Sequence, residues 1–249
     1  MMKVSSKWFI LFFLGASATL VATESATSPA VSQYAPLADL QAQAKFFMDR
    51  IETDLADEAA YGEDQQGRVG KDASTLAAIG LLLGQHDKDH PGKASARLLI
   101  ESSASLAEEA TDYAAAKEAF AQVKQAIESK VQAEPVEWEP VGNLLYLMQQ
   151  VPIVNNALRR SVTGRRFKRE IDKSAGYAAT LAAISQASMY DTDYCSDEED
   201  EKKWRKICAD MRDAAADVNR AVRAGDQETA KIGLAKLAET CDACHDDFR

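Results

Sequence analysis

The stretch 141-VGNLLYLMQQVPIVNNALRRS-161 decides the fold class of this chain. Its apolar residues recur every three or four positions, at Leu144, Leu147, Met148, Val151, Val154 and Leu158. That spacing places them on one face of a helix, with the polar residues on the other face. Pro152 lacks a backbone donor and is expected to kink or split the helix. The stretch therefore predicts an amphipathic helix that contributes to a core.

Three more helices are expected after this one, at 168–189, 199–224 and 227–248. The inward face of the second of these three is read from the residues Trp204, Ile207, Met211, Ala214, Ala215 and Val218. Gly225 follows that helix and is expected to end it, because glycine readily adopts the left-handed conformation of a C-cap. Four amphipathic helices with short connections predict an antiparallel four-helix bundle.

An internal repeat extends this plan to the first half of the chain. TLAAI occurs at 75–79 and 180–184, YAPLADL at 34–40 matches WEPVGNL at 138–144, and 115–126 resembles 229–240. The matches keep the same order along the chain. We therefore expect two copies of one four-helix unit, at 32–132 and 136–249, joined by the linker AEPVEWEP. The helices of the first copy are expected at 36–60, 72–85, 94–111 and 113–131.

Composition agrees with this class. The 249 residues are rich in Ala, Glu, Asp, Lys, Leu and Gln and contain only 12 Gly and 6 Pro. The fold class predicted is all-α, with two tandem four-helix bundles. The net charge of −10 argues against a nucleic-acid partner and favours basic partner proteins, although a solvated acidic surface would explain it as well.

The chain ends in CDACHDDFR, residues 241–249. Cys241, Cys244 and His245 form the C-x-x-C-H pattern of c-type haem attachment. In that chemistry two thiols form thioethers with the haem vinyl groups, and the imidazole binds one side of the iron. A redox dithiol would favour a βαβ setting, and a zinc site needs a second pair of ligands. Neither is evident, so one covalent haem c per chain is expected.

Residues 1–23 have the features of a signal peptide. Lys3 and Lys7 precede an apolar run from Trp8 to Leu14, and small residues follow up to Ala22. The run is shorter than the roughly 20 residues of a membrane span. Cleavage near Ala22 would give a periplasmic or otherwise exported protein, with no membrane span in the mature chain.

The second copy resembles cytochrome c′, a family of four-helix-bundle haem proteins. The resemblance rests on the C-x-A-C-H-x-x-[FY]-R ending, AGD at 224–226, Trp204 near the start of the third helix and Tyr146 in the first. It covers about the last 50 residues specifically and the first two helices more weakly. It implies an exported protein that binds nitric oxide or carbon monoxide, or that transfers electrons to a partner protein. No distal His or Arg pair is evident near the first helix, so a peroxidase-type enzyme is not expected.

The resemblance also implies roles for individual residues. His245 would be the proximal iron ligand, and Arg249 would lie beside it. Val151 would be the apolar residue on the distal side, which leaves the iron open to small gases. The Arg that the family places after the Tyr is replaced by Leu147, so the usual charge partner of a haem propionate is missing.

Met148 and Trp204 leave alternatives open. A related group of bundle cytochromes uses a first-helix Met as a second axial ligand, which would make the protein an electron carrier. A Met on a core stripe is more often explained by packing. Trp204 would line the haem or simply pack in the core.

Cys195 and Cys208 lie outside the haem motif. In an oxidising compartment a disulfide between them would close a loop of about 13 residues, which entropy models value at about 3 kcal/mol. The alternative is two free thiols, with Cys208 buried as a small apolar residue.

The first copy is expected to carry no haem, because Ile127, Lys130 and Val131 stand where the second copy has its haem motif. The resemblance implies a use for it, since family members often pair through their first two helices. The haemless copy could take the partner's position within one chain. Alternatively it binds a partner protein, and the chain is a haem-based sensor or scaffold.

Overall fold

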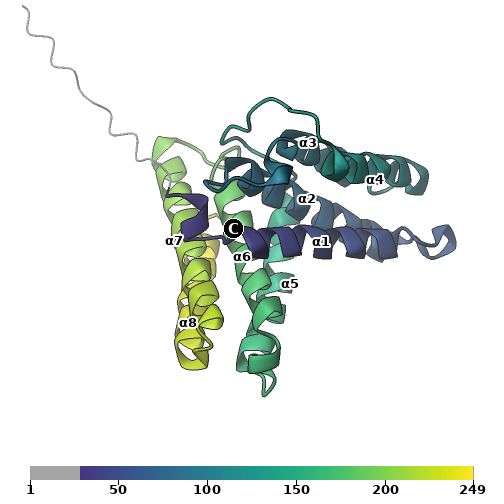
Figure 1. The fold of residues 1–249 in the computed structure, drawn as a ribbon. Coiled ribbons are helices and arrows are strands. Elements are labelled where there is room, and N and C mark those ends of the chain that lie inside the picture. The colour runs from purple at the N-terminus through teal and green to yellow at the C-terminus, as the bar shows by residue number, and fades with distance from the viewer. Residues whose placement is uncertain (1–28, 249) are drawn as a thin grey trace, which may run out of the picture.

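The computed structural model describes residues 29–248, which form eight α-helices, four short 3-10 helices and no strand (Figure 1). The α-helices are α1 (Leu37–Asp54), α2 (Glu63–Gln85), α3 (Ala96–Glu109), α4 (Tyr113–Glu128), α5 (Leu144–Thr163), α6 (Ile171–Ser188), α7 (Glu198–Arg223) and α8 (Gln227–Phe248). The predicted all-α class is confirmed. The predicted signal peptide, at 1–23, lies outside the described residues. No helix in the described part is long and apolar enough to cross a membrane.

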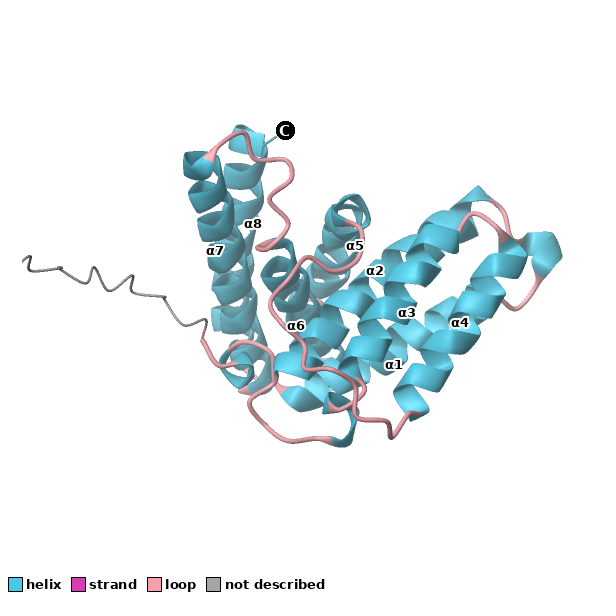
Figure 2. Cartoon of the chain, turned by 90° about the horizontal axis from the view of Figure 1, so that it is seen from above, coloured by secondary structure: helices cyan, strands magenta, loops and turns pink. Residues whose placement is uncertain are grey.

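The helices form two sets of four, in chain order. Within each set, consecutive helices pack against each other, and α5 returns to contact α8. In the first set α4 returns to α1, where Tyr113 Oη and Lys117 Nζ donate hydrogen bonds to the carbonyl oxygen of Leu55, at 3.1 and 3.2 Å. Figure 2 shows the two sets as separate arms that meet along α1, α2, α5 and α6.

The two sets share a buried interface, in which α1 packs on α6, and α2 packs on both α5 and α6. Polar side chains cross this interface in pairs. Thr180 Oγ1 donates to Gln43 Oε1 at 2.9 Å, and Gln150 Nε2 donates to Asp72 Oδ1 at 2.9 Å. Each pair is buried, so these hydrogen bonds also fix how the two sets are aligned.

The repeated TLAAI segments lie at the centre of this interface. Residues 75–79 belong to α2 and residues 180–184 to α6, and all ten are buried. A helix that is buried on every side needs small and apolar residues all round rather than one apolar stripe. This requirement is shared by α2 and α6, and it explains why these two segments are so alike.

Pro152 does not split α5, so that part of the prediction is wrong. The helix runs without a break from Leu144 to Thr163. Pro152 lies on its exposed side, while Leu147, Val151 and Val154 bury the opposite side. The burial of that stripe holds the helix together across the one backbone hydrogen bond that proline removes.

The helix α2 begins at Glu63, nine residues before the predicted start at 72. The added segment contains Gly67 and Gly70, which lower helix propensity and hide the helix from a reading of sequence alone. Tertiary packing overrides that propensity here. A Cβ on Gly70 would lie 2.7 Å from Cε2 of Tyr146, so the absence of a side chain lets α5 approach α2.

Two glycines with positive φ end or begin helices. Gly225, with φ of 72°, follows α7 as predicted, and Asp226 N–H donates to Ala221 O at 2.9 Å behind it. Gly142, with φ of 69°, precedes α5, and a Cβ there would lie 3.1 Å from the backbone oxygen of Ser74 in α2. Nothing lies within 4 Å of the corresponding position at Gly225.

Replacing Gly142 by alanine should therefore destabilise the protein more than the same change at Gly225. Both changes place a side chain in the left-handed region, at a cost of about 1 kcal/mol or slightly more. Only Gly142→Ala also forces α5 away from the backbone of α2, so we expect a total of about 2–3 kcal/mol. Urea unfolding of the two variants measures the difference. Equal losses of unfolding free energy would mean that the approach of α5 to α2 is not tight.

Candidate haem-attachment site

The haem motif lies in the last two turns of α8, a helix that is fixed at both ends. At its start, Asp226 accepts hydrogen bonds from Thr229 N and Oγ1, at 3.0 and 2.6 Å, which lower the pKa of the Asp226 carboxyl. Near its end, Lys203 Nζ of α7 lies 2.7 Å from Asp247 Oδ1. The motif is therefore presented by a regular helix rather than by a loose terminus.

Cys241 and Cys244 are both half-buried, and they contact different parts of the core. Cys241 packs against the main core, which both helix sets share. Cys244 packs against a smaller group that we call the Trp204 cluster, made of Leu144, Met148, Met189, Cys195, Trp204, Cys208, Cys244 and Phe248. The two thiols thus lie on the inward side of α8, facing apolar side chains of α5 and α7.

Trp204 is the centre of this cluster and is firmly held. Its side chain is buried, and its Nε1–H donates to the carbonyl oxygen of Ser188 at 2.8 Å. Its ring meets that of Phe248 edge to face, with centroids 5.4 Å apart. The predicted site residue Trp204 therefore lies beside Cys244, and the indole donor is already used.

The His245 side chain is exposed, and no side-chain hydrogen bond or ion pair joins it to another residue between 29 and 248. Its imidazole nitrogens are consequently available as ligands. Arg249, which the resemblance places beside His245, lies outside the described residues.

On α5, Val151 and Met148 belong to the groups of packed residues that also contain the two cysteines. Val151 is buried in the main core, and Cys241 packs against the same core. Met148 is half-buried and contacts both the main core and the Trp204 cluster. Leu144 completes the α5 side of the cluster, although only a place in the core was predicted for it. Leu144 lies one helical turn before Met148 on the same apolar stripe, and this spacing could have indicated that both residues line the same cluster.

These residues fit a covalently attached haem. The donor set consists of two thiols three residues apart and a free imidazole next to the second thiol, against an apolar wall. Burial raises the pKa of the Cys241 and Cys244 thiols above the ordinary range. A raised pKa keeps both thiols protonated at neutral pH, which disfavours a thiolate–metal site.

Cys195 and Cys208 are free thiols in this structure, so the predicted disulfide between them stays a prediction. Both belong to the Trp204 cluster, where Cys208 is buried and Cys195 half-buried. Burial raises the pKa of Cys208, and the neighbouring Cys244 and Cys195 act in the same direction. The cluster therefore brings Cys195 and Cys208, the two cysteines outside the haem motif, close to Cys244, which the sequence did not indicate.

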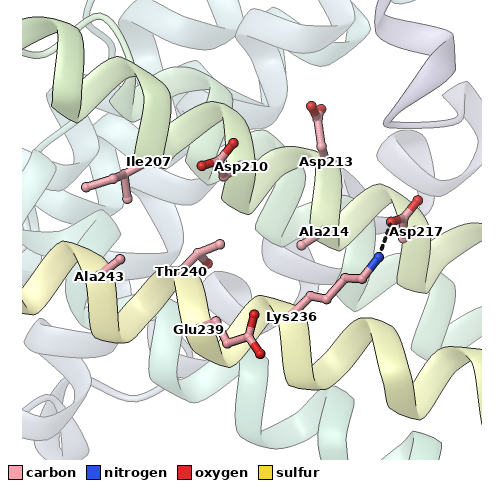
Figure 3. A pocket seen from close by; sticks show the side chains of 9 residues that line it. All are labelled: Ile207, Asp210, Asp213, Ala214, Asp217, Lys236, Glu239, Thr240 and Ala243. Carbon is pink, nitrogen blue, oxygen red and sulfur yellow. Dashed lines mark ion pairs between the residues drawn. The ribbon is translucent and has the colours of Figure 1, made fainter.

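An acidic pocket lies on the outer side of the same two helices (Figure 3). It has a volume of about 450 Å³ and lies between α7 and α8. Its floor includes Ala214 and Ala243, and Lys236 Nζ lies 3.8 Å from Asp217 Oδ2. The remaining lining residues are Ile207, Thr240, Asp210, Asp213 and Glu239. Because Ala243 lies between the two motif cysteines, this pocket adjoins the haem motif from the solvent side.

Comparison with curated proteins and with solved structures finds no match to this chain. One family model does match, and it covers residues 198–249, which include α7, α8 and the whole C-x-x-C-H motif. The matching model is that of cytochrome C′, so the C-terminal segment of the chain, residues 198–249, is similar to cytochrome c′, a family of c-type haem proteins.

Proposed function

We propose that this chain is an exported c-type cytochrome that carries one haem and binds a diatomic gas, nitric oxide or carbon monoxide, or transfers electrons. Cys241 and Cys244 would attach the haem, and His245 would bind the iron. The observation that carries the proposal is the inward placement of both thiols against apolar residues of α5 and α7, with a free imidazole beside them. The family match supports the haem itself.

The walls around the motif suit a ligand that needs no hydrogen bond. When bound, the haem supplies an iron that changes oxidation state and accepts diatomic ligands. Val151 and Leu144 offer only apolar surface, and the Trp204 N–H is taken by Ser188 O. Dioxygen gains most from a nearby donor, whereas carbon monoxide and nitric oxide need none. We therefore propose that these two gases bind more strongly than dioxygen.

The optical spectrum of the reduced, purified full-length protein tests this function. An open site should give a high-spin spectrum that shifts when carbon monoxide is added. His245→Ala should keep the thioethers but change the iron spectrum. His90→Ala, far from the motif on the first helix set, is the control and should leave the spectrum as it is. A spectrum that is unchanged in His245→Ala would refute the assignment of His245.

Met148 supports a second candidate function, an electron carrier with a methionine ligand. Met148 and Met189 both belong to the Trp204 cluster, and of these two only Met148 also packs against the main core. The comparison of Met148→Ala with Met189→Ala separates ligation from packing. For an open site neither change should alter the spin state. A low-spin protein that becomes high-spin only in Met148→Ala would establish the electron carrier instead.

We also propose roles for the remaining surfaces. The contacts of α1 and α2 with α5 and α6 support a first copy that fills the position of a pairing partner. The carboxylates of the acidic pocket, beside Ala243, support a basic redox partner that approaches from the solvent side of α8. A sensor or scaffold role for the first copy remains the alternative. It predicts a protein that binds the first copy and responds to the redox state of the haem.

A further inference from the structure

The second helix set carries a dense basic segment in an otherwise acidic chain. Residues 159–173 contain seven basic residues and only two acidic ones, Glu170 and Asp172, while the net charge of the chain is −10. All seven basic residues are exposed, and six of them lie around the turn between α5 and α6. We call them the basic tip: Arg159, Arg160, Arg165, Arg166, Lys168 and Arg169.

The basic tip is an ordered end of the molecule. It lies where α5 and α6 project beyond the rest of their set, next to the α7–α8 turn (Figure 1). Gln227 Nε2 at the start of α8 donates to Val162 O at 2.6 Å, which joins the two turns. Phe167 is 2% exposed and anchors the short helix Phe167–Arg169 in the core. The side chains around it are thereby held outward together.

The cations of the basic tip have no partners. None of the six side chains forms an ion pair or a hydrogen bond within the described part of the chain, residues 29–248. Of the nearby acids, Asp172 lies 2.5 Å from Arg223 and Glu228 lies 2.7 Å from Lys231, while Glu170 is the one carboxylate within the turn itself. Six like charges on one turn repel one another, so this surface gains from any anionic surface that neutralises them.

We propose that the basic tip binds the anionic phospholipid headgroups of a membrane surface. A specific protein interface usually has an apolar or aromatic centre within a polar rim. The tip has no such centre, because its one aromatic residue, Phe167, is buried. Clusters of four to eight Lys and Arg residues on an amphipathic helix or beside a membrane span are typical of binding to anionic lipids, and the tip gathers six such residues at the adjoining ends of α5 and α6. The tip, with six exposed cations and no exposed aromatic residue, fits an extended anionic surface better than a shaped protein pocket.

Such binding would orient the haem motif. The helix α8 starts beside the tip and reaches Cys241 after 14 residues, which is about 21 Å at 1.5 Å per residue. The motif and the acidic pocket would then face away from the lipid, toward a diffusing partner. The tip itself does not depend on haem, so lipid binding and the proposed haem function can fail separately.

Vesicle sedimentation with the full-length protein tests the proposal. The wild type should bind phosphatidylcholine vesicles that contain phosphatidylglycerol, and this binding should weaken as the salt concentration rises. It should not bind vesicles of phosphatidylcholine alone. The triple variant Arg165→Gln/Arg166→Gln/Lys168→Gln should bind the anionic vesicles at least tenfold more weakly. Circular dichroism and haem content confirm that the variant is folded.

The matched control removes the same charge elsewhere. Lys202, Arg205 and Lys206 are exposed at the start of α7, on another part of the surface. Lys202→Gln/Arg205→Gln/Lys206→Gln should bind anionic vesicles like the wild type. A wild type that ignores anionic vesicles, a tip variant that binds as well as the wild type, or a control that loses as much as the tip variant would each overturn the proposal. Capture of an acidic protein without binding to vesicles would also overturn it.

Discussion

Serine in place of both Cys241 and Cys244 should abolish covalent haem attachment. A hydroxyl group does not form the thioether that holds haem c, and these are the thiols of the C-x-x-C-H motif. The wild type, exported from a host that can attach haem, should gain the mass of one haem per chain. Mass spectrometry of the unfolded protein, in which only covalent haem is retained, should show that this mass is absent from the double variant.

The other two cysteines provide the control. Cys195→Ala/Cys208→Ala also removes two thiols of the same chain, both from the Trp204 cluster beside Cys244. It should still carry one haem, although it should be less stable because Cys208 is buried. The expectation fails if the wild type carries two haems or none, or if haem is lost from the control as completely as from Cys241→Ser/Cys244→Ser. Thiol counting on the unfolded, unreduced wild type decides whether the predicted Cys195–Cys208 disulfide forms.

The attachment residues could be predicted because their chemistry is local. A spacing of two residues between Cys241 and Cys244 is sufficient to place both thiols on one side of a helix, whatever the rest of the fold does. The residues opposite them were harder to predict. Leu144, Met148 and Val151 all lie on the same stripe of α5, and which of them meets Cys244 depends on how far α5 is shifted along α8. The spacing of residues within one helix carries no information on that shift.

The fold shows the same division. The positions of α5, α7 and α8 follow from apolar residues that recur with the period of a helix, and they were predicted to within a few residues. The start of α2 was missed because glycines near Gly70 weaken its local helix signal. The end of α1 was placed six residues too late, at 60 rather than Asp54, because a separate short helix, Glu58–Ala60, follows it. Both errors lie where tertiary contacts, rather than helix propensity, set the boundary.

The acidic pocket and the basic tip could not be inferred from the net charge. The value of −10 sums over the whole chain and hides a turn that is strongly positive. Carboxylates at Asp210, Asp213 and Asp217 recur at helix spacing, but their meaning depends on Glu239 of the neighbouring helix. The acidic pocket joins residues of two helices, so it became evident only once α7 and α8 were placed side by side, whereas the basic residues at 159–169 are adjacent in the sequence and only their common exposure depends on the fold.

Asp72 should make the stability of the protein depend on pH between about 4 and 7. Its carboxyl is fully buried between the two helix sets, where Gln150 Nε2 donates to Oδ1 at 2.9 Å and Arg50 Nε lies 2.9 Å from Oδ2. Burial raises the pKa of Asp72 to about 7, and Arg50 and Gln150 counteract that rise only in part. Lys71 lowers the pKa slightly and Asp54 raises it slightly.

The direction of the effect follows from which state binds the proton. Between the unfolded pKa of Asp72, about 3.8, and the folded pKa, about 7, the folded protein holds a proton that the unfolded chain has released. Stability from this proton is complete below pH 4 and is lost as pH rises through 7. Asp72→Asn keeps a neutral side chain at every pH. The unfolding free energy of Asp72→Asn minus that of the wild type should therefore rise by about 2–3 kcal/mol from pH 5 to pH 8.

Urea unfolding of the full-length protein at pH 5 and pH 8 measures this difference. Asp49→Asn is the matched control, because Asp49 is an exposed aspartate of α1 whose partner is Lys45, 2.8 Å away. Its difference from the wild type should change little with pH. A difference for Asp72→Asn that stays constant from pH 5 to pH 8 would mean that Arg50 and Gln150 fully stabilise the ionised carboxylate. In that case Asp72 would stay ionised and form a permanent ion pair with Arg50, and Gln150 would donate a hydrogen bond to it. These contacts would hold α1, α2 and α5 together at every pH in the range. The contact between the two helix sets would then be insensitive to pH over this range.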